Sequence, residues 1–134
     1  HFAVANGDGV ILSPNPQLIR EMLDFHIWED ALATLLVCPL DGVGLTIPGV
    51  WHDRQGRVTH FGKESRGQTQ CHHFASYMFF SDRIWDLLPA GSSNILYDVL
   101  EPLIKKGEKV MAYQSDDLKW FETGNTSDYL KASR

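Results

Sequence analysis

The stretch that organises this chain is ALATLLVCPL at residues 31–40, where apolar side chains follow one another almost without a break. A continuous apolar run of this length is typical of a strand buried on both faces of a sheet. The segment before it predicts an amphipathic helix, because Asn15 can cap a helix and Pro16 suits a first helical position. The apolar residues of that helix recur three and four positions apart, at Leu18, Ile19, Met22, Leu23 and Ile27.

The segments on either side predict further strands and helices. Residues 50–52 and 58–61 form the arms of a β-hairpin around the turn at residues 53–56. The other expected elements are strands within residues 1–5, 71–80, 109–114 and 118–122, and helices within residues 81–89, 93–106 (kinked at Pro102) and 125–131. Strands that alternate with helices indicate an α/β protein. We expect one domain over residues 1–134, built on a mixed, mostly parallel sheet flanked by helices, with one β-hairpin.

Composition and charge narrow the classes of function. With 134 residues, of which 43% are hydrophobic and 22% charged, the chain has the make-up of a globular domain. The formal net charge of −5 provides no basic field for a phosphate backbone. The two cysteines make no disulfide framework and fit a reducing compartment, and no apolar run reaches membrane-spanning length. These features predict a cytoplasmic protein whose partners are neither nucleic acids nor membranes.

Two carboxylates are the strongest candidates for chemistry. Asp8 follows the first strand within an Asn-Gly-Asp-Gly turn, and Glu122 ends the last strand just before Gly124. Ligands gather beyond the carboxyl ends of strands in open α/β sheets, so we expect both side chains to face one cleft at the same edge of the sheet. Two acids there suit a shared Mg²⁺ or Mn²⁺, which offsets their repulsion. The alternative is structural, with Asp8 as a turn residue and Glu122 as a solvated strand end.

Other features of the sequence suggest metal or phosphate binding, but structural explanations of them are at least as good. The run Cys71-His72-His73 cannot converge on one metal ion, because neighbouring residues of a strand point to opposite faces. The Gly-rich residues 41–49 lack the Gly-Lys-Ser/Thr ending of a P-loop. Lys63 and Arg66 either meet a phosphate or belong to a solvated loop. The aromatic pairs at residues 79–80 and 120–121 are interpreted as core.

The order of motifs along the chain resembles that of one enzyme family. FAVANGD at 2–8 and VWHDRQGRVTHF at 50–61 resemble the Asn-Gly-Asp strand and the Val-x-x-Asp-x-x-Gly-Arg-Val-x-x-Phe hairpin of the sugar-phosphate nucleotidyltransferases, or nucleotide-sugar pyrophosphorylases. FAS at 74–76, LLP at 87–89, GEKVMAY at 107–113 and WFETGNTSDYL at 120–130 are similar to the Phe-x-Gly, Leu-Leu-Pro, Gly-x-x-Val-x-x-Tyr and Trp-x-Asp-x-Gly-x-x-x-x-Tyr-Leu motifs of that family. The similarity covers nearly the whole chain and corresponds to the central and C-terminal part of the family's catalytic domain.

The resemblance implies an incomplete Rossmann-like nucleotidyltransferase fold. It also implies a reaction in which a sugar 1-phosphate attacks the α-phosphorus of a nucleoside triphosphate, giving a nucleotide-sugar and pyrophosphate. On this reading Asp8 and Glu122 are catalytic and hold Mg²⁺ or Mn²⁺. Gly49 matches a glycine that brings backbone against the sugar, Ser76 stands at the glycine of Phe-x-Gly, and Lys63 corresponds loosely to the lysine of Glu-Lys-Pro. These three are the expected substrate-binding residues.

Several positions depart from the family pattern. The Gly-x-Gly-x-Arg nucleotide-binding segment of the family does not occur in this sequence, Glu122 replaces an aspartate, and Ser76 replaces a glycine. A non-catalytic relative that keeps the fold for binding or assembly is therefore the alternative function. From the 134-residue chain alone we expect no synthesis of nucleotide-sugars. We also expect self-association as a homo-oligomer, through strand edges that the absent segment leaves uncovered.

Overall fold

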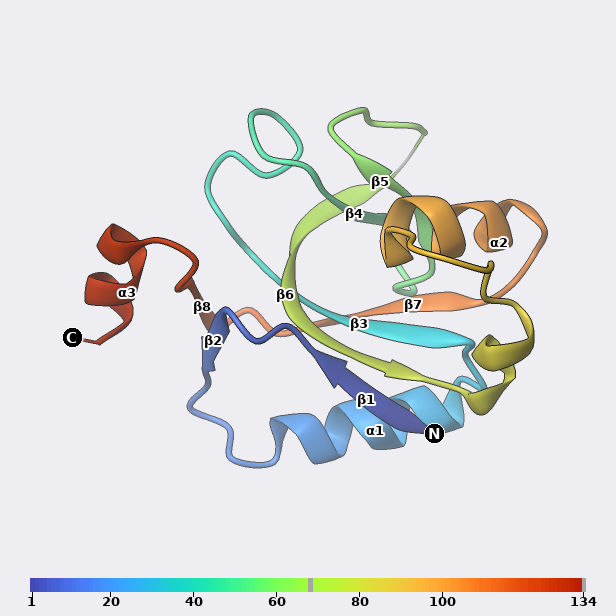
Figure 1. Ribbon diagram of the computed structural model, residues 1–134, viewed down its shortest axis with the longest axis horizontal. Helices are drawn as coiled ribbons and strands as arrows, with labels where there is room; N and C mark the ends of the chain where they lie inside the picture. Colours follow the sequence, from blue (N-terminus) through green and yellow to red (C-terminus); the bar gives the residue numbers. More distant parts are fainter. Residues whose placement is uncertain (68, 134) are drawn as a thin grey trace.

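A computed structural model describes residues 1–67 and 69–133 of the chain. A six-stranded sheet forms its centre, and a separate two-stranded ribbon lies at one end (Figure 1). The strands of the sheet are β1 (Phe2–Ala5), β3 (Ala33–Cys38), β4 (Gly49–His52), β5 (Val58–Gly62), β6 (Gln70–Phe80) and β7 (Val110–Gln114). The ribbon pairs β2 (Gly9–Leu12) with β8 (Lys119–Glu122) and is called the β2–β8 ribbon below.

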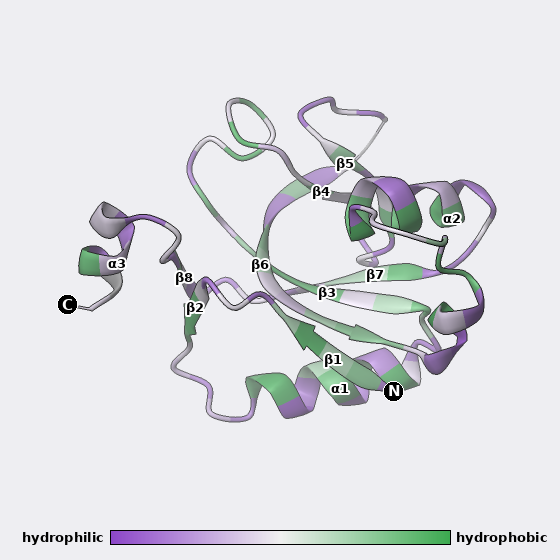
Figure 2. Ribbon diagram, viewed as in Figure 1, coloured by the Kyte–Doolittle hydropathy of each residue, from purple (hydrophilic) through white to green (hydrophobic). Residues whose placement is uncertain are grey.

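Helices cover both faces of the sheet. They pack against side chains of β3 that point alternately to the two faces. Helix α1 (Leu18–Trp28) shares a core cluster with Leu36 and Cys38, whereas α2 (Glu101–Lys105) shares another with Leu35 and Val37. Successive residues of a strand face opposite sides, so β3 contributes to both clusters. All six residues of β3 are buried, as the continuous apolar run predicts, and the central strands are coloured as largely hydrophobic in Figure 2.

The predicted sheet was wrong in one respect, because it is mostly antiparallel. The order is β5-β4-β6-β3-β7, with β1 also paired to β6, and only the β3–β7 pair is parallel. Strands β1, β3 and β7 do run in the same direction. The long strand β6 runs the other way between β1 and β3, because the chain that leads from β3 to β6 contains a loop and a hairpin instead of a crossover helix.

One edge of β6 changes partners along its length, and this creates a gap. Its C-terminal residues, 77–80, pair with β1, while residues 70–72 pair with β4 on the same edge, opposite β3. Residues 73–76 lie between these two partners. Within that stretch Ser76 has a φ of +64°, a value that side-chain-bearing residues seldom adopt. This edge gap positions the cleft described below.

Most local predictions are confirmed, with small shifts at the ends of elements. The hairpin forms as β4 and β5, and Asn125 caps α3 (Thr126–Ala132) by accepting from the amide of Asp128. Helix α1 begins at Leu18, two residues after the expected Pro16. The kink expected at Pro102 takes the form of a π-helical turn, Ile95–Leu100, directly before α2, and residues 82–86 form a short 3₁₀ helix. The pairing of β2 was not predicted.

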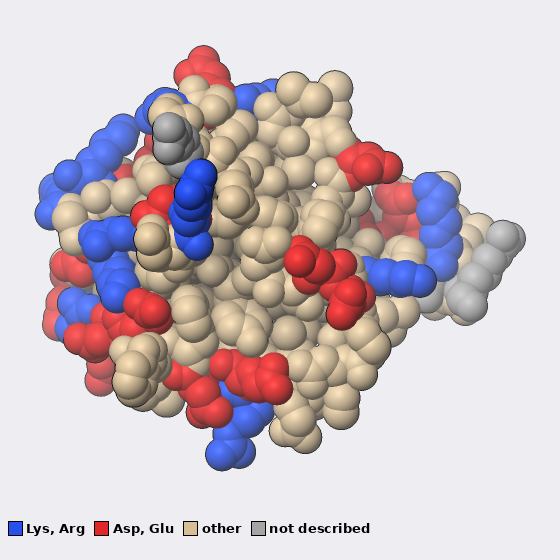
Figure 3. Space-filling view, turned by 180° about the vertical axis from the view of Figure 1, so that it is seen from behind, with Lys and Arg blue, Asp and Glu red and all other residues tan. Residues whose placement is uncertain are grey.

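The surface carries charges of both signs. Acidic and basic side chains are interspersed around the rim of one face, whose centre is uncharged (Figure 3). In the part of the chain that the structure describes, no helix is long and apolar enough to cross a membrane.

Candidate functional site

The β2–β8 ribbon brings the two predicted carboxylates together. Gly9 pairs directly with Glu122 across the ribbon, and Asp8 immediately precedes Gly9. The amide and hydroxyl of Thr123 donate to the backbone oxygen of Asp8 at 2.7 and 2.8 Å. Asp8 Oδ2 and Glu122 Oε1 each lie 3.6 Å from the position that a Cβ would occupy at Gly124. The two carboxylate oxygens are therefore separated by no more than twice that distance.

The reason for this proximity differs from the one expected. The prediction placed both acids at the carboxyl ends of parallel strands in one sheet. In the structure they belong to the separate ribbon, and antiparallel pairing places the turn before β2 beside the end of β8. Both side chains are exposed at this end of the molecule. The two acids do lie close together, but through a different topology from the one expected.

The carboxylate pair fits a hard divalent cation. Mg²⁺ and Mn²⁺ prefer oxygen ligands, and Mg²⁺ commonly takes one or two carboxylates and completes its shell with water and phosphate oxygens. No ion pair involves Asp8 or Glu122 among the described residues, so no lysine or arginine there neutralises them directly. The same residues contain no cluster of three or more His, Cys, Asp or Glu suited to a metal ion. Among the described residues, any cation at this pair would thus have no third His, Cys, Asp or Glu ligand beside the two carboxylates.

A cleft of about 230 Å³ opens at the edge gap of β6, and neither Asp8 nor Glu122, which were expected to face one cleft, is among the residues that line it. It lies between the end of β1 and the start of β4, with the π-helical turn before α2 on one side and the β2–β8 ribbon on the other. Gly9 joins the cleft to the ribbon, because a Cβ at that position would lie 2.7 Å from Ser76. Its polar and aromatic lining comprises Asn6, Phe61, His73, Phe74, Ser76, Tyr97 and Trp120.

Gly49 lines the cleft, but close packing around it already explains why this position is a glycine. A Cβ there would lie 2.4 Å from Cys71 Sγ, 2.7 Å from Val43 Cγ2 and 3.0 Å from the backbone oxygen of His72. No side chain fits in that space without displacing its neighbours. The role expected for Gly49, close approach of backbone to a sugar, stays a prediction.

Ser76 also lines the cleft and is held by Trp120. The indole Nε1 of Trp120 donates to Ser76 Oγ at 3.1 Å, and the amide of Asn6 donates to the backbone oxygen of Ser76 at 2.9 Å. Ser76 is only 8% exposed. Ser76 therefore lies in the wall of the cleft, and its expected role in substrate binding stays a prediction.

Lys63 lies elsewhere. It is exposed in the loop after β5 and is not among the residues that line the cleft. Its role in substrate binding stays a prediction that the geometry does not strengthen.

The two aromatic pairs differ from each other in burial. Phe79 and Phe80 are buried as expected, whereas Trp120 is half-buried and faces the cleft.

His73 is a cleft residue that the sequence did not reveal. Its ring lies against the indole of Trp120, with 4.1 Å between ring centroids, and both ring nitrogens are buried with no hydrogen-bond partner among the described residues. His72 instead contacts His52, so the two adjacent histidines do lie in different environments. No sequence signal marks His73, since its position depends on the edge gap. Trp120 and Asn6, in contrast, belong to recognisable motifs.

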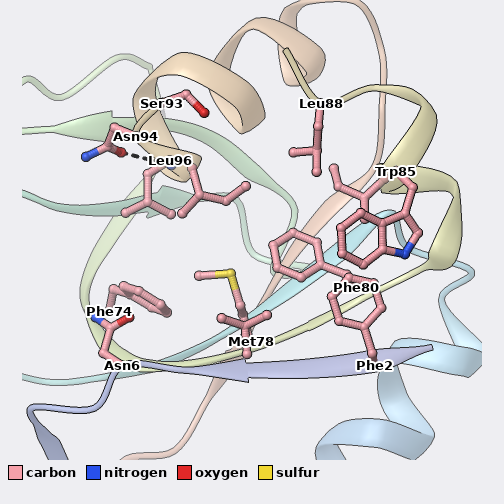
Figure 4. A pocket seen from close by; sticks show the side chains of 13 residues that line it. Phe2, Asn6, Phe74, Met78, Phe80, Trp85, Leu88, Ser93, Asn94 and Leu96 are labelled. Carbon is pink, nitrogen blue, oxygen red and sulfur yellow. Dashed lines mark hydrogen bonds between the residues drawn. The ribbon is translucent and has the colours of Figure 1, made fainter. Parts of the chain in front are cut away.

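A larger cavity adjoins the cleft, sharing Asn6, Phe74 and Leu96 with it, but its lining has the wrong chemistry for a reaction site. Its volume is about 560 Å³, and no charged residue lines it. Figure 4 shows Phe2, Phe80 and Trp85 grouped on one side of it, with Met78 and Phe74 along its floor. Asn94, one of its few polar residues, is occupied in capping, because its Oδ1 accepts from the amides of Leu96 and Tyr97.

Comparison with known proteins supports the fold. No protein-family model and no curated protein matches the sequence. Solved structures do match: HddC from Yersinia pseudotuberculosis complexed with GMP-PN (18% identity, TM-score 0.71, 98% of this chain and 53% of that one) and UTP-bound UGPase from Acinetobacter baumannii (18%, 0.77, 98% and 48%). An apo UDP-glucose pyrophosphorylase is similar at 16% identity, with a TM-score of 0.73 over 98% of this chain and 52% of that one. The chain therefore has the fold of a portion of these nucleotidyltransferases and spans about half their length.

The histidines near the cleft make stability depend on pH. Burial lowers the pKa of His72 and the adjacent His52 lowers it further, while Asp116 opposes the shift. Burial also lowers the pKa of His73. The carbonyl of Asp53 can only accept, so His52 Nδ1 donates to it, and His52 Nε2 accepts from His72 Nδ1 at 2.7 Å. Burial and the neighbouring His52 ring therefore favour the neutral form of His72 in the folded state.

We expect the free energy of unfolding to be fully retained above about pH 6.5 and to fall as the pH drops below it. The unfolded chain takes up protons near the usual histidine pKa, whereas the folded chain takes them up only at lower pH. Each ring contributes less than about 1.4 kcal/mol per pH unit, the limit for one proton, because the unfolded and folded chains differ by less than one bound proton per ring over this range. Urea unfolding between about pH 7.5 and 5.5 measures the slope.

A variant with one fewer titrating ring provides the control for this slope. His73→Leu removes one group with a lowered pKa and should make the dependence shallower. Equal slopes in the variant and the parent, or constant stability over this range, would contradict the prediction.

Proposed function

We propose that this chain is part of a sugar-phosphate nucleotidyltransferase, which joins a nucleoside triphosphate to a sugar 1-phosphate and releases pyrophosphate. The fold is that of a portion of nucleotidyltransferases, two of which were solved in complex with GMP-PN and with UTP. A shared fold at this identity does not fix an activity. The proposal therefore depends on the arrangement of the residues at the candidate site.

The observation that carries the proposal is the position of the carboxylate pair beside the cleft. Asp8 and Glu122 flank Gly124, and Gly9, which follows Asp8, touches Ser76 in the cleft wall. A sugar phosphate bound in the cleft can thus place its phosphate near the two acids. Asp8 and Glu122 would hold Mg²⁺ or Mn²⁺ there.

Each part of this arrangement has a task in the proposed reaction. The metal ion, when bound, supplies positive charge that offsets the charge building up on the phosphates. The cleft residues bind and orient the sugar, so that its phosphate oxygen is in line with the α-phosphorus. Asn6 and Tyr97 provide polar groups in the wall, and Phe61 and Leu96 provide apolar surface.

Binding measurements on the 134-residue chain test the proposal. We expect α-D-glucose 1-phosphate or α-D-mannose 1-phosphate to bind with a Kd between about 1 μM and 1 mM, the range usual for enzyme substrates, and to bind more tightly with Mg²⁺. Isothermal titration calorimetry with and without the cation gives both values. If neither sugar phosphate nor UDP-glucose binds under any of these conditions, the proposal fails.

The cation dependence separates the two candidate functions. Sugar-phosphate binding that Mg²⁺ does not affect would favour the non-catalytic alternative, since the carboxylate pair would then have no role. Pyrophosphate release with nucleoside triphosphate and hexose 1-phosphate is measured in parallel. We expect none above background from this chain, because its sequence lacks the family's Gly-x-Gly-x-Arg segment.

A further inference from the structure

Ser76 occupies a backbone conformation that favours glycine. Its φ of +64° lies in the left-handed region, where a side chain costs free energy that glycine does not pay. It is one of only two such non-glycine residues in the described part of the chain. Strained positions of this kind concentrate at functional sites, and Ser76 lines the candidate sugar cleft.

The hydroxyl of Ser76 has a defined orientation. An indole N–H can only donate, so Trp120 Nε1 uses the acceptor side of Ser76 Oγ at 3.1 Å. Gly9 encloses the hydroxyl on another side, because a Cβ there would be 2.7 Å from Oγ. The hydroxyl hydrogen of Ser76 has no acceptor among the described residues. Ser76 therefore retains one oriented donor in the wall of the cleft.

We infer that Ser76 and Trp120 form a specificity-determining pair, in which the Ser76 hydroxyl donates a hydrogen bond to an oxygen of the bound sugar. Trp120 acts as a positioning residue in this pair, because its indole N–H donates to the Ser76 hydroxyl oxygen and holds it in place. The inference rests on the proposed function and deepens it. A site built to donate to a ligand oxygen discriminates strongly against ligands that lack it. The strained Ser76 thus provides a contact that glycine cannot.

The test compares sugar phosphate with inorganic phosphate as probes. We expect Ser76→Ala and Ser76→Gly each to weaken binding of the tighter of the two hexose 1-phosphates by about 3- to 10-fold, as loss of one hydrogen bond predicts. Binding of inorganic phosphate should not change. Ser81→Ala is the matched control, because Ser81 is similarly buried but caps the 3₁₀ helix outside the cleft. Equal weakening of both probes would assign the contact to phosphate and overturn the inference.

Thermal melting of the same variants tests the backbone argument. Both variants lose the hydroxyl, but only Ser76→Gly relieves the positive φ. We expect Ser76→Gly to melt at a higher temperature than Ser76→Ala, the reverse of the usual order of these residues in strands and helices. A lower melting temperature for Ser76→Gly than for Ser76→Ala would contradict the claim that the backbone at Ser76 is strained.

An indole NMR signal tests the part played by Trp120. Adding the hexose 1-phosphate should shift the Trp120 Nε1–H resonance and leave that of Trp51, which donates to the backbone oxygen of Gly62, in place. Trp120→Phe should weaken binding as much as Ser76→Ala. If the parent chain binds the sugar phosphate and these variants bind it equally well, the inference fails while the proposed function stands. If the parent binds no sugar phosphate, the inference fails, and if it does not bind UDP-glucose either, the proposed function fails as well.

Discussion

Gly49→Ala should destabilise the protein by about 3 kcal/mol, at the upper end of the cost of overpacking a core. The new methyl group would lie 2.4 Å from Cys71 Sγ and 3.0 Å from the backbone oxygen of His72, where β4 pairs with β6. Backbone cannot move aside without breaking that pairing. Because small proteins are stable by only about 5–15 kcal/mol, the loss is a large fraction of the total. Urea unfolding followed by tryptophan fluorescence measures it.

Gly7→Ala provides the matched control for this effect. Nothing lies within 4 Å of a Cβ at Gly7, and its φ is not in the region that requires glycine. The same chemical change should therefore alter the free energy of unfolding by less than about 0.5 kcal/mol. Comparable losses in the two variants would show that close packing is not what distinguishes Gly49.

Glu122→Gln and Asp8→Asn should each weaken Mn²⁺ binding at least about tenfold, or about 1.4 kcal/mol. Each substitution keeps the size of the side chain but removes one of the two negative charges beside Gly124. With only two carboxylates in the site, the one that remains holds a divalent ion weakly. The electron paramagnetic resonance signal of free Mn²⁺, measured during titration of each variant, gives the affinities.

Asp86→Asn controls for the loss of charge itself. Asp86 is exposed in the 3₁₀ helix, and removing its charge changes the net charge by the same amount. We expect its Mn²⁺ affinity to equal that of the parent. If Glu122→Gln and Asp8→Asn bind Mn²⁺ as Asp86→Asn does, the two acids do not form the cation site, and the turn and strand-end explanation of these residues is the correct one.

Parts of the candidate site followed from sequence and parts did not. Asp8 and Glu122 stand in recognisable turn motifs, and the structure does bring them together, although their expected metal role awaits the experiment above. The predicted reason was wrong, because it assumed that both strands belong to one parallel sheet. Gly9 was interpreted as part of a turn, yet it begins β2 and pairs with Glu122. Four-residue strands such as β2 carry too short a pattern to identify a partner more than a hundred residues away.

Local chemistry determined the elements of this protein. The buried run at residues 33–38, the hairpin around Asp53 and Gly56 and the cap at Asn125 each form where nearby residues predict them, because their signals depend on backbone preferences and periodicity over a few positions. Tertiary structure alone decided the insertion of β6 antiparallel to its neighbours and the edge gap that follows from it. That gap exposes the cleft and places His73 there. Such features arise from pairing between segments far apart in the chain, whose free energy no local stretch of sequence contains.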